Sequence, residues 1–347
     1  MDTNKIIPLI EKFHSMKIFS LDNNFEISFE KQLLIPYAGV DVLDDEASEH
    51  SGSALYMILQ ADRLEITNIN INNDPPIIEY RNCTSNQTHQ IDNLWFFPFP
   101  IPRDALHIKI LSETLVEIGI KEAWRLCSPQ LQEFEPTKLS IYDLVTQSKR
   151  TSETILEFDL LYIGSSKSIH PRLINHKTIL RIYRDMALFR SRKELFVWIL
   201  KPKSSFYKPY SGEFLNACSS SVRSKDKMFG IDVDDEQLLA ISEAMLINYF
   251  KPKYNDHYKS KSPSYSHVVY AKLLDAGVKH LQVNLNLFMQ VCKDILSINT
   301  ESKNTENTKH LSLYCKLDDL LNKQEDNVLS VEILPEELYD LFIGNQE

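Results

Sequence analysis

The chain has no long apolar run, no regular cysteine pattern and no internal repeat. No stretch approaches the about 18 uncharged apolar residues that a membrane-spanning helix needs, and the first residues lack the basic-then-apolar order of a secretory signal. The five cysteines are scattered and odd in number, which favours reduced thiols over a disulfide framework or a zinc site. These absences predict a cytoplasmic protein without a membrane partner.

Charge is distributed unevenly along the 347 residues. The net charge of -10 argues by itself against a nucleic-acid partner. Between residues 165 and 227, however, 14 Lys and Arg face four Asp and Glu, so this window is +10 and the rest of the chain sums to -20. Segregation of this kind is typical of a surface that binds a polyanion. A solvated helix face that happens to be basic is the alternative.

The pattern of apolar residues predicts three regions. Residues 1–135 read as an α+β domain, with helices at 6–13 and 104–124 and strands at 32–37, 54–60, 63–69 and 76–80. Residues 138–258 read as a central domain, with strands at 138–145, 155–163 and 194–200, a helix after residue 168, a loop at 203–232 and a helix at 234–250.

The third region, residues 262–347, is smaller and mixes helices with strands. We expect helices at 266–276, 288–298 and 335–342, and strands at 279–287 and 311–317. A polar tract near 299–309 lacks apolar residues and is predicted to be disordered.

Two short motifs in the central region carry residues suited to chemistry. The first is Tyr162-Ile163-Gly164-Ser165-Ser166 at a strand end, followed by Arg172 and, four residues later on the same helical face, His176. The second starts at Glu243 and continues past Pro252 to Asn255, which can return a polar side chain toward that carboxylate. Hydrolysis of a phosphodiester needs an activated water, compensation of phosphoryl charge and help for the leaving oxygen, and these residue types supply all three.

Each of these residues also has a structural interpretation. Tyr162 is equally typical of a half-buried aromatic at a strand end. Arg172 and Glu243 would serve as surface residues or as an ion pair. His176 would also serve as a packing residue on a helix face, and asparagines such as Asn255 commonly cap turns.

The order of the motifs resembles the GIY-YIG nuclease superfamily over about residues 138–258. The first motif matches the family's second tripeptide, Tyr-Ile-Gly. The nearest counterpart of its first tripeptide, Gly-Ile-Tyr, is Ser140-Ile141-Tyr142, with serine in place of glycine. The resemblance implies an α+β fold with a small three-stranded antiparallel sheet flanked by helices, and one divalent metal ion, Mg²⁺ or Mn²⁺.

The resemblance also implies a role for each matching residue. Tyr142 would fill the first-strand position, and Tyr162 would assist or orient the attacking water. Arg172 would bind the phosphate, and Glu243 would hold the metal ion beside the leaving oxygen. Since the free pKa of tyrosine is about 10, its use as a base requires the positive charge of Arg172 and the metal.

Two further residues complete the implied site. His176 would contact phosphate or share proton transfer, and Asn255 would support the site by hydrogen bonding. Basic residues beside the motifs are expected to bind the nucleic acid: Lys167, Lys177, Arg181, Lys251 and Lys253.

The sequence therefore predicts a metal-dependent endonuclease that acts on DNA rather than RNA. The flanking regions would supply target choice or assembly, through a homo-oligomer or a protein partner. By analogy of architecture alone, such a protein would suit restriction or antiphage defence. The alternatives are an inactive GIY-YIG-like protein that binds nucleic acid or serves as a scaffold, and a protein whose acidic flanks bind a protein partner.

Overall fold

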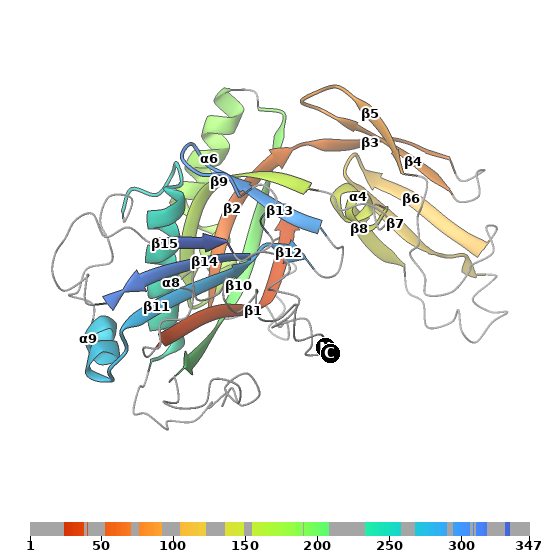
Figure 1. Ribbon diagram of the computed structural model, residues 1–347. Helices are drawn as coiled ribbons and strands as arrows, with labels where there is room; N and C mark the ends of the chain where they lie inside the picture. Colours follow the sequence, from red (N-terminus) through yellow and green to blue (C-terminus); the bar gives the residue numbers. More distant parts are fainter. Residues whose placement is uncertain are drawn as a thin grey trace, which may run out of the picture.

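A nine-stranded, curled, mixed sheet dominates the computed structural model (Figure 1). The structure describes residues 24–37, 40, 53–70, 76–91, 105–122, 136–148, 155–189, 191–207, 233–257, 268–289, 294–305, 308, 310–317 and 330–333. The order of strands across the sheet is β12-β13-β9-β2-β10-β1-β11-β14-β15. Their bounds are β1 (Asn24–Pro36), β2 (Ala54–Asp62), β9 (Ile155–Ser166), β10 (Lys193–Tyr207), β11 (His280–Asn286), β12 (Phe288–Met289), β13 (Asp294–Asn299), β14 (His310–Lys316) and β15 (Ser330–Ile333).

Neighbouring strands of this sheet are antiparallel except for two parallel pairs, β1 with β11 and β13 with β9. The strands come from all three regions that the sequence pattern predicts. The expected boundaries near 135–138 and 258–262 therefore do not separate independent sheets.

The predicted three-stranded antiparallel sheet exists only as the centre of this larger sheet, and one of its strands is different. β9 and β10 cover the expected strands at 155–163 and 194–200. The strand between them is β2, and not the expected strand at 138–145. All side chains at 54–59 are buried, which is typical of a central strand covered on both faces. A partner about 100 residues away in sequence leaves no local sign of the pairing.

Helices cover both faces of the central strands. Met57 and Leu59 of β2 belong to one buried cluster with Met245. Tyr56 and Ile58, on the opposite face, belong to a second cluster. The first cluster contains side chains of α8 (Asp235–Phe250) and α9 (Val268–Asp275), and the second contains side chains of α5 (Ile169–Ile174) and α6 (Lys177–Leu188).

Helix α8 begins and ends at clear local signals. Asp234 caps its N terminus, and its side chain accepts a hydrogen bond from the backbone of Gln237 in a capping box. Asp235 in the first turn adds a favourable charge at the positive end of the helix. Lys251 ends the helix in the left-handed region, with φ of 50°, and Pro252 follows it. The helix expected at 234–250 is therefore confirmed.

A separate module is inserted between β2 and β9 (Figure 1). It holds two three-stranded antiparallel sheets, β3-β4-β5 and β6-β7-β8, that share one core with α4. The bounds of its elements are β3 (Leu64–Asn70), β4 (Ile77–Asn82), β5 (Thr88–Ile91), β6 (Leu106–Ser112), β7 (Leu115–Ile120), β8 (Thr137–Ser140) and α4 (Ile141–Ser148).

Two helix predictions are wrong in the described chain. The segment expected as a helix at 104–124 is the β6–β7 hairpin. Its apolar residues alternate as well as they follow a helical period, and many are β-branched. The segment expected as a helix at 288–298 contains β12 and β13 instead.

The polar tract near 299–309 is not disordered over the residues that the structure describes. A bridge joins Asn299 to Asn304, and the buried Thr305 hydroxyl accepts a hydrogen bond from the Ile298 backbone at 2.8 Å. The expected helices at 6–13 and 335–342, and the expected loop beyond residue 207, lie outside the described residues. The expected elements at 266–276, 279–287 and 311–317 are confirmed as α9, β11 and β14.

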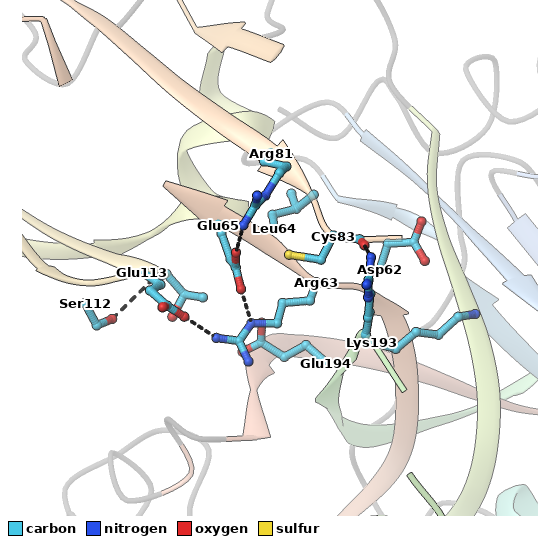
Figure 2. A network of polar contacts seen from close by, with 12 residues as sticks. Asp62, Arg63, Leu64, Glu65, Arg81, Cys83, Ser112, Glu113, Lys193 and Glu194 are labelled. Carbon is cyan, nitrogen blue, oxygen red and sulfur yellow. Dashed lines mark hydrogen bonds and ion pairs between the residues drawn. The ribbon is translucent and has the colours of Figure 1, made fainter. Parts of the chain in front are cut away.

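Ion pairs tie the inserted module together where it leaves the main sheet (Figure 2). Arg63 pairs with Glu65 at 3.2 Å and with Glu113 at 2.6 Å, and Arg81 pairs with Glu65 at 2.8 Å. The Arg63 backbone donates to the carbonyl of Arg192, just before β10, at 3.0 Å. The same arginine therefore links both sheets of the module to the central sheet. No helix in the described part of the chain is long and apolar enough to cross a membrane.

Candidate active site

Gly164 lies where two tyrosines from neighbouring strands meet. It is paired directly with Tyr56 across the antiparallel β2–β9 ladder. A Cβ atom on Gly164 would lie 2.6 Å from the Tyr56 hydroxyl oxygen and 2.7 Å from the ring of Tyr162. Only glycine therefore leaves room for both tyrosine side chains over this strand.

Arg172 brings positive charge to this pair of tyrosines. It is exposed in the last turn of α5, and the pKa of its guanidinium is raised by interaction with the hydroxyls of Tyr56 and, less strongly, Tyr162. The hydroxyl of Tyr37, the residue after β1, donates to the carbonyl of Leu173 at 2.9 Å and so anchors α5. Within the described residues, the buried Tyr56 hydroxyl makes no hydrogen bond with normal distance and angle.

Glu243 comes from α8, which packs on the sheet face opposite to the one that carries Tyr56 and Tyr162, and it reaches the end of β9 at Ser165. The Ser165 hydroxyl donates to its Oε2 at 2.5 Å. Burial raises the pKa of Glu243, and the Ser165 hydrogen bond and the charge of Arg172 oppose that rise. The carboxylate in turn raises the pKa of Tyr162, after the larger effect of burial. Tyrosine, arginine and carboxylate are therefore electrostatically coupled in one site.

His176 contacts both tyrosines. Its ring centroid is 6.0 Å from that of Tyr56 and 5.0 Å from that of Tyr162. Nδ1 accepts a hydrogen bond from the Thr178 backbone at 3.1 Å and thereby caps α6. Burial, with a smaller effect of Arg172, lowers the pKa of His176 to about 4. The neutral ring then carries its proton on Nε2, a buried atom without a partner among the described residues.

Asn255 is a buried clamp on the β9 backbone. Its Oδ1 accepts from the Ile163 nitrogen at 2.9 Å, and its Nδ2 donates to the Ile163 carbonyl at 2.8 Å. The neighbouring Tyr254 nitrogen donates to the carbonyl of Leu161 at 3.0 Å. Asn255 therefore holds the strand between Tyr162 and Gly164, and its amide is used on backbone groups rather than on the Glu243 carboxylate.

The two tyrosines are neutral in the free protein. Burial is the largest cause that raises the pKa of Tyr56 and of Tyr162. Arg172 lowers both values, but by less than burial raises them. Within the protein alone the pKa of Tyr162 is thus raised, and its use as a base stays a prediction that needs the metal ion as well as Arg172.

Tyr142 does not lie at this site. It is in α4, and its hydroxyl accepts from the Leu64 nitrogen at 3.1 Å and lies 2.9 Å from Glu194 Oε2 and 3.1 Å from the Asp62 carbonyl. Its ring packs against Phe196, on the sheet face opposite to the one that carries Tyr56 and Tyr162. The expectation that Tyr142 lies beside Tyr162 is wrong, and Tyr142 instead joins the inserted module to the main sheet. Tyr142 takes this position because the segment after Ser140 is the helix α4 and not a strand.

Sequence reasoning missed Tyr56 and gave no role to Ser165. Ala54-Leu55-Tyr56 keeps the small, aliphatic, tyrosine order of the tripeptide Gly-Ile-Tyr. That order is the available signal for Tyr56. Its distance from Tyr162 in the sequence hides it, because the inserted module separates two strands that are neighbours in space.

The five predicted nucleic-acid contacts lie on three different segments. Lys167 is exposed and forms an ion pair with Glu236 at the start of α8. Lys177 is the first residue of α6. Arg181 of α6 and Lys253 each lie 5.4 Å from the ring centroid of Tyr254, and Lys251 is the exposed C-cap of α8.

A divalent ion would find one carboxylate here. No group of three or more His, Cys, Asp and Glu side chains gathers as a metal site in the described ranges of the chain. Mg²⁺ keeps several water ligands and is often held by one or two carboxylates together with substrate phosphate. Glu243 fits that limited demand, because Ser165 occupies Oε2 and leaves Oε1 for coordination.

Comparison with known proteins adds no family to this geometry. No family model matches the chain, and neither curated proteins nor solved structures show a significant match.

Proposed function

We propose that the protein is a metal-dependent endonuclease that hydrolyses phosphodiester bonds in DNA. The observation that carries this proposal is the placement of Tyr56, Tyr162 and Arg172 beside Gly164, with Glu243 held at the neighbouring Ser165. These residues come from four separate elements, β2, β9, α5 and α8. A purely structural ion pair would not need two tyrosine hydroxyls, and a buried aromatic pair would not need an exposed arginine.

The topology around the site supports a GIY-YIG-like domain. The helix that carries Arg172, α5, follows β9, and the helix that carries Glu243, α8, follows β10; the two pack on opposite faces of the antiparallel core β9-β2-β10. In this proposal Tyr56 takes the first-strand position that the order of motifs assigns to Tyr142. The module between β2 and β9 is then an insertion between the two tyrosine strands.

Arg172 supplies the electrostatic part of the reaction. It is exposed, so a phosphate can reach its guanidinium, and it already interacts with both tyrosine hydroxyls. A phosphate bound there would lie beside the groups that orient water. Fixed positive charge aimed at developing phosphoryl charge is a large contribution to catalysis.

The tyrosines and His176 act by hydrogen bonding. Tyr56 and Tyr162 are protonated in the free protein, and His176 offers the N–H of Nε2. Tyr162 is partly exposed, so its hydroxyl can orient a water molecule or donate to a phosphate oxygen. The Tyr56 hydroxyl and His176 Nε2 are buried and would act through Tyr162 and Arg172. A divalent ion held by Glu243 would lower the pKa of water and neutralise charge on the leaving oxygen.

The test is cleavage of supercoiled plasmid by the full chain in the presence of Mg²⁺ or Mn²⁺. Arg172→Ala and Glu243→Ala are expected to abolish cleavage. Arg81→Ala is a matched control, because Arg81 is an ion-paired arginine of the inserted module. Asp235→Ala is the control for Glu243, because Asp235 is an exposed carboxylate at the start of the same helix. Equal loss in target and control variants would contradict the assignment.

A nucleic-acid-binding protein without catalysis is the second candidate. The raised pKa values of both tyrosines favour it, because neither tyrosine is a base near neutral pH in the free protein. Salt-dependent DNA binding by wild-type protein that never nicks plasmid would establish this alternative. A parallel assay with RNA of the same sequence decides between the two nucleic acids.

A further inference from the structure

One face of α6 combines large exposed apolar side chains with positive charge. Leu180 and Leu188 lie two helical turns apart with Arg184 between them, so the three share one side of the helix. Leu180 is 61% exposed and Leu188 is 71% exposed. Phe189, the C-cap residue, is 81% exposed. Single exposed leucines are ordinary, but a row of apolar side chains marks an interaction surface.

This face begins at the candidate active site. His176, which contacts both Tyr56 and Tyr162, is the N-cap of α6. The helix has 12 residues and therefore leads about 18 Å away from the site. Lys177 and Arg181 project on the same side as the leucines, as expected from spacings of three and four residues. A strand held at the site could follow this helix.

We propose that the exposed face of α6 binds nucleic acid by inserting Leu180, Leu188 and Phe189 among its bases. The idea rests on the proposed function for its substrate, since the same strand would be held at Arg172. Apolar wedges flanked by basic residues unstack neighbouring bases in proteins that deform nucleic acids, and aromatic side chains stack on freed bases.

Charge selects this occupant over a second copy of the chain. In a two-fold dimer the same patch meets itself, so Lys177, Arg181 and Arg184 of one copy would face the same three cations of the other. The neighbouring carboxylate, Asp185, already pairs with Arg184 at 3.7 Å and accepts from the Tyr254 hydroxyl at 2.9 Å. Like charges facing each other oppose such an interface. A polyanion with apolar base faces complements both features of the helix.

The test measures binding of fluorescently labelled DNA duplex that carries 2-aminopurine. The full chain is used in EDTA, so that cleavage does not interfere. The variant Leu188→Ala/Phe189→Ala is compared with Ile110→Ala, because Ile110 is an exposed apolar residue of β6, 46% accessible, on the inserted module. We expect about tenfold weaker binding by the double variant and loss of the rise in 2-aminopurine fluorescence. The control should match wild type.

Salt dependence separates the apolar contribution from the charged one. The double variant removes no charge and should keep the slope of affinity against salt concentration. Lys177→Ala/Arg184→Ala should reduce that slope by about 0.9 for each phosphate that is no longer neutralised by a cationic side chain. Unchanged melting temperatures show that all variants are folded.

Several results would overturn the inference. Equal affinity and equal 2-aminopurine signal in the double variant and the control would do so. So would a changed sedimentation coefficient with unchanged DNA affinity, which would point to self-association. Plasmid cleavage by wild type with normal binding by the double variant would reject the inference and keep the proposed function. Weakened binding by the double variant in a chain that never cleaves would support the inference and reject the proposed function.

Discussion

Removing the hydroxyl of Tyr56 should abolish activity without loss of stability. In Tyr56→Phe the ring stays in the buried cluster under α5 and α6. The deleted hydroxyl makes no hydrogen bond within normal geometric limits in the described structure, so its loss removes only its interaction with the Arg172 guanidinium. Because Arg172 is exposed and can bind water instead, the free energy of unfolding should change by no more than about 1 kcal/mol. Cleavage should fall by about 100- to 10,000-fold, the usual contribution of a positioned acid-base group.

Tyr142→Phe is the matched control and should give the opposite pattern. The Tyr142 hydroxyl accepts from the Leu64 nitrogen and donates toward Glu194 at 2.9 Å. Its loss removes the hydrogen bond from the Leu64 backbone and the hydrogen bond to the Glu194 carboxylate, and leaves both of these groups unsatisfied. We expect destabilisation by about 2 to 4 kcal/mol, with cleavage per folded molecule close to wild type.

Both quantities can be measured on the same preparations. Urea unfolding gives the free energy of unfolding, and plasmid nicking under single-turnover conditions gives the rate per folded molecule. A Tyr142→Phe variant that is stable but inactive, beside an active Tyr56→Phe variant, would falsify the placement of the first tyrosine. Loss of both activity and stability in Tyr56→Phe would mean that this hydroxyl is structural.

Three further perturbations test the supports of the site. Gly164→Ala places a Cβ atom within 2.7 Å of both tyrosine side chains; thermal unfolding should show about 1 to 3 kcal/mol of destabilisation, and cleavage should be lost. Asn255→Ala leaves the backbone N–H and carbonyl of Ile163 without their side-chain partner, so we expect about 2 to 4 kcal/mol of destabilisation by urea titration; a stable but inactive variant would instead indicate direct contact with substrate. The pKa of Glu194 is raised above its ordinary value of 4.5, chiefly by burial, so the folded chain binds this proton more tightly than the unfolded chain. Wild-type stability should therefore fall as pH rises from 4.5 through the raised pKa. The melting temperature of Glu194→Gln should lack that fall, and parallel pH profiles of the two proteins would contradict the assignment.

The parts of the site that are local in sequence could be predicted, because local signals determine them. Gly164 ends the Tyr162 strand, and the spacing from Arg172 to His176 follows one helical turn. Asp234 and Pro252 mark the ends of the helix that carries Glu243. Each of these signals lies within a few residues of the feature that it specifies.

The position of Tyr56 could not be predicted in this way. A buried apolar run such as residues 54–59 predicts a central strand, but not which strand lies beside it. The pairing of Tyr56 with Gly164 spans the whole inserted module. Ser140-Ile141-Tyr142 is closer to Tyr162 in sequence and is therefore the expected match, although that segment is helical from Ile141 onward.

The prediction of secondary structure failed where the apolar residues fit both the alternation of a strand and the spacing of a helix. Leu106, Ile108 and Ile110 alternate along β6, and Val116 and Ile118 alternate along β7. The same run also places apolar residues three and four apart, which favours an amphipathic helix. The β-branched side chains and the turn at the hairpin decide for strands, because they pack on a pleated surface with little loss of rotamer freedom.

The inserted module leaves the site intact because it joins β2 and β9 at the ends of these strands that are far from Tyr56 and Gly164. β2 and β9 pair continuously in space from Ala54 opposite Ser166 to Gln60 opposite Asp159, with one bulge between. Tyr56 is six residues from Asp62, where β2 ends, so the module leaves the sheet about 20 Å from the tyrosines. The entropic cost of closing a longer connection grows slowly with its length. Changes within the module can therefore alter what it contacts without shifting the register that opposes Tyr56 to Gly164.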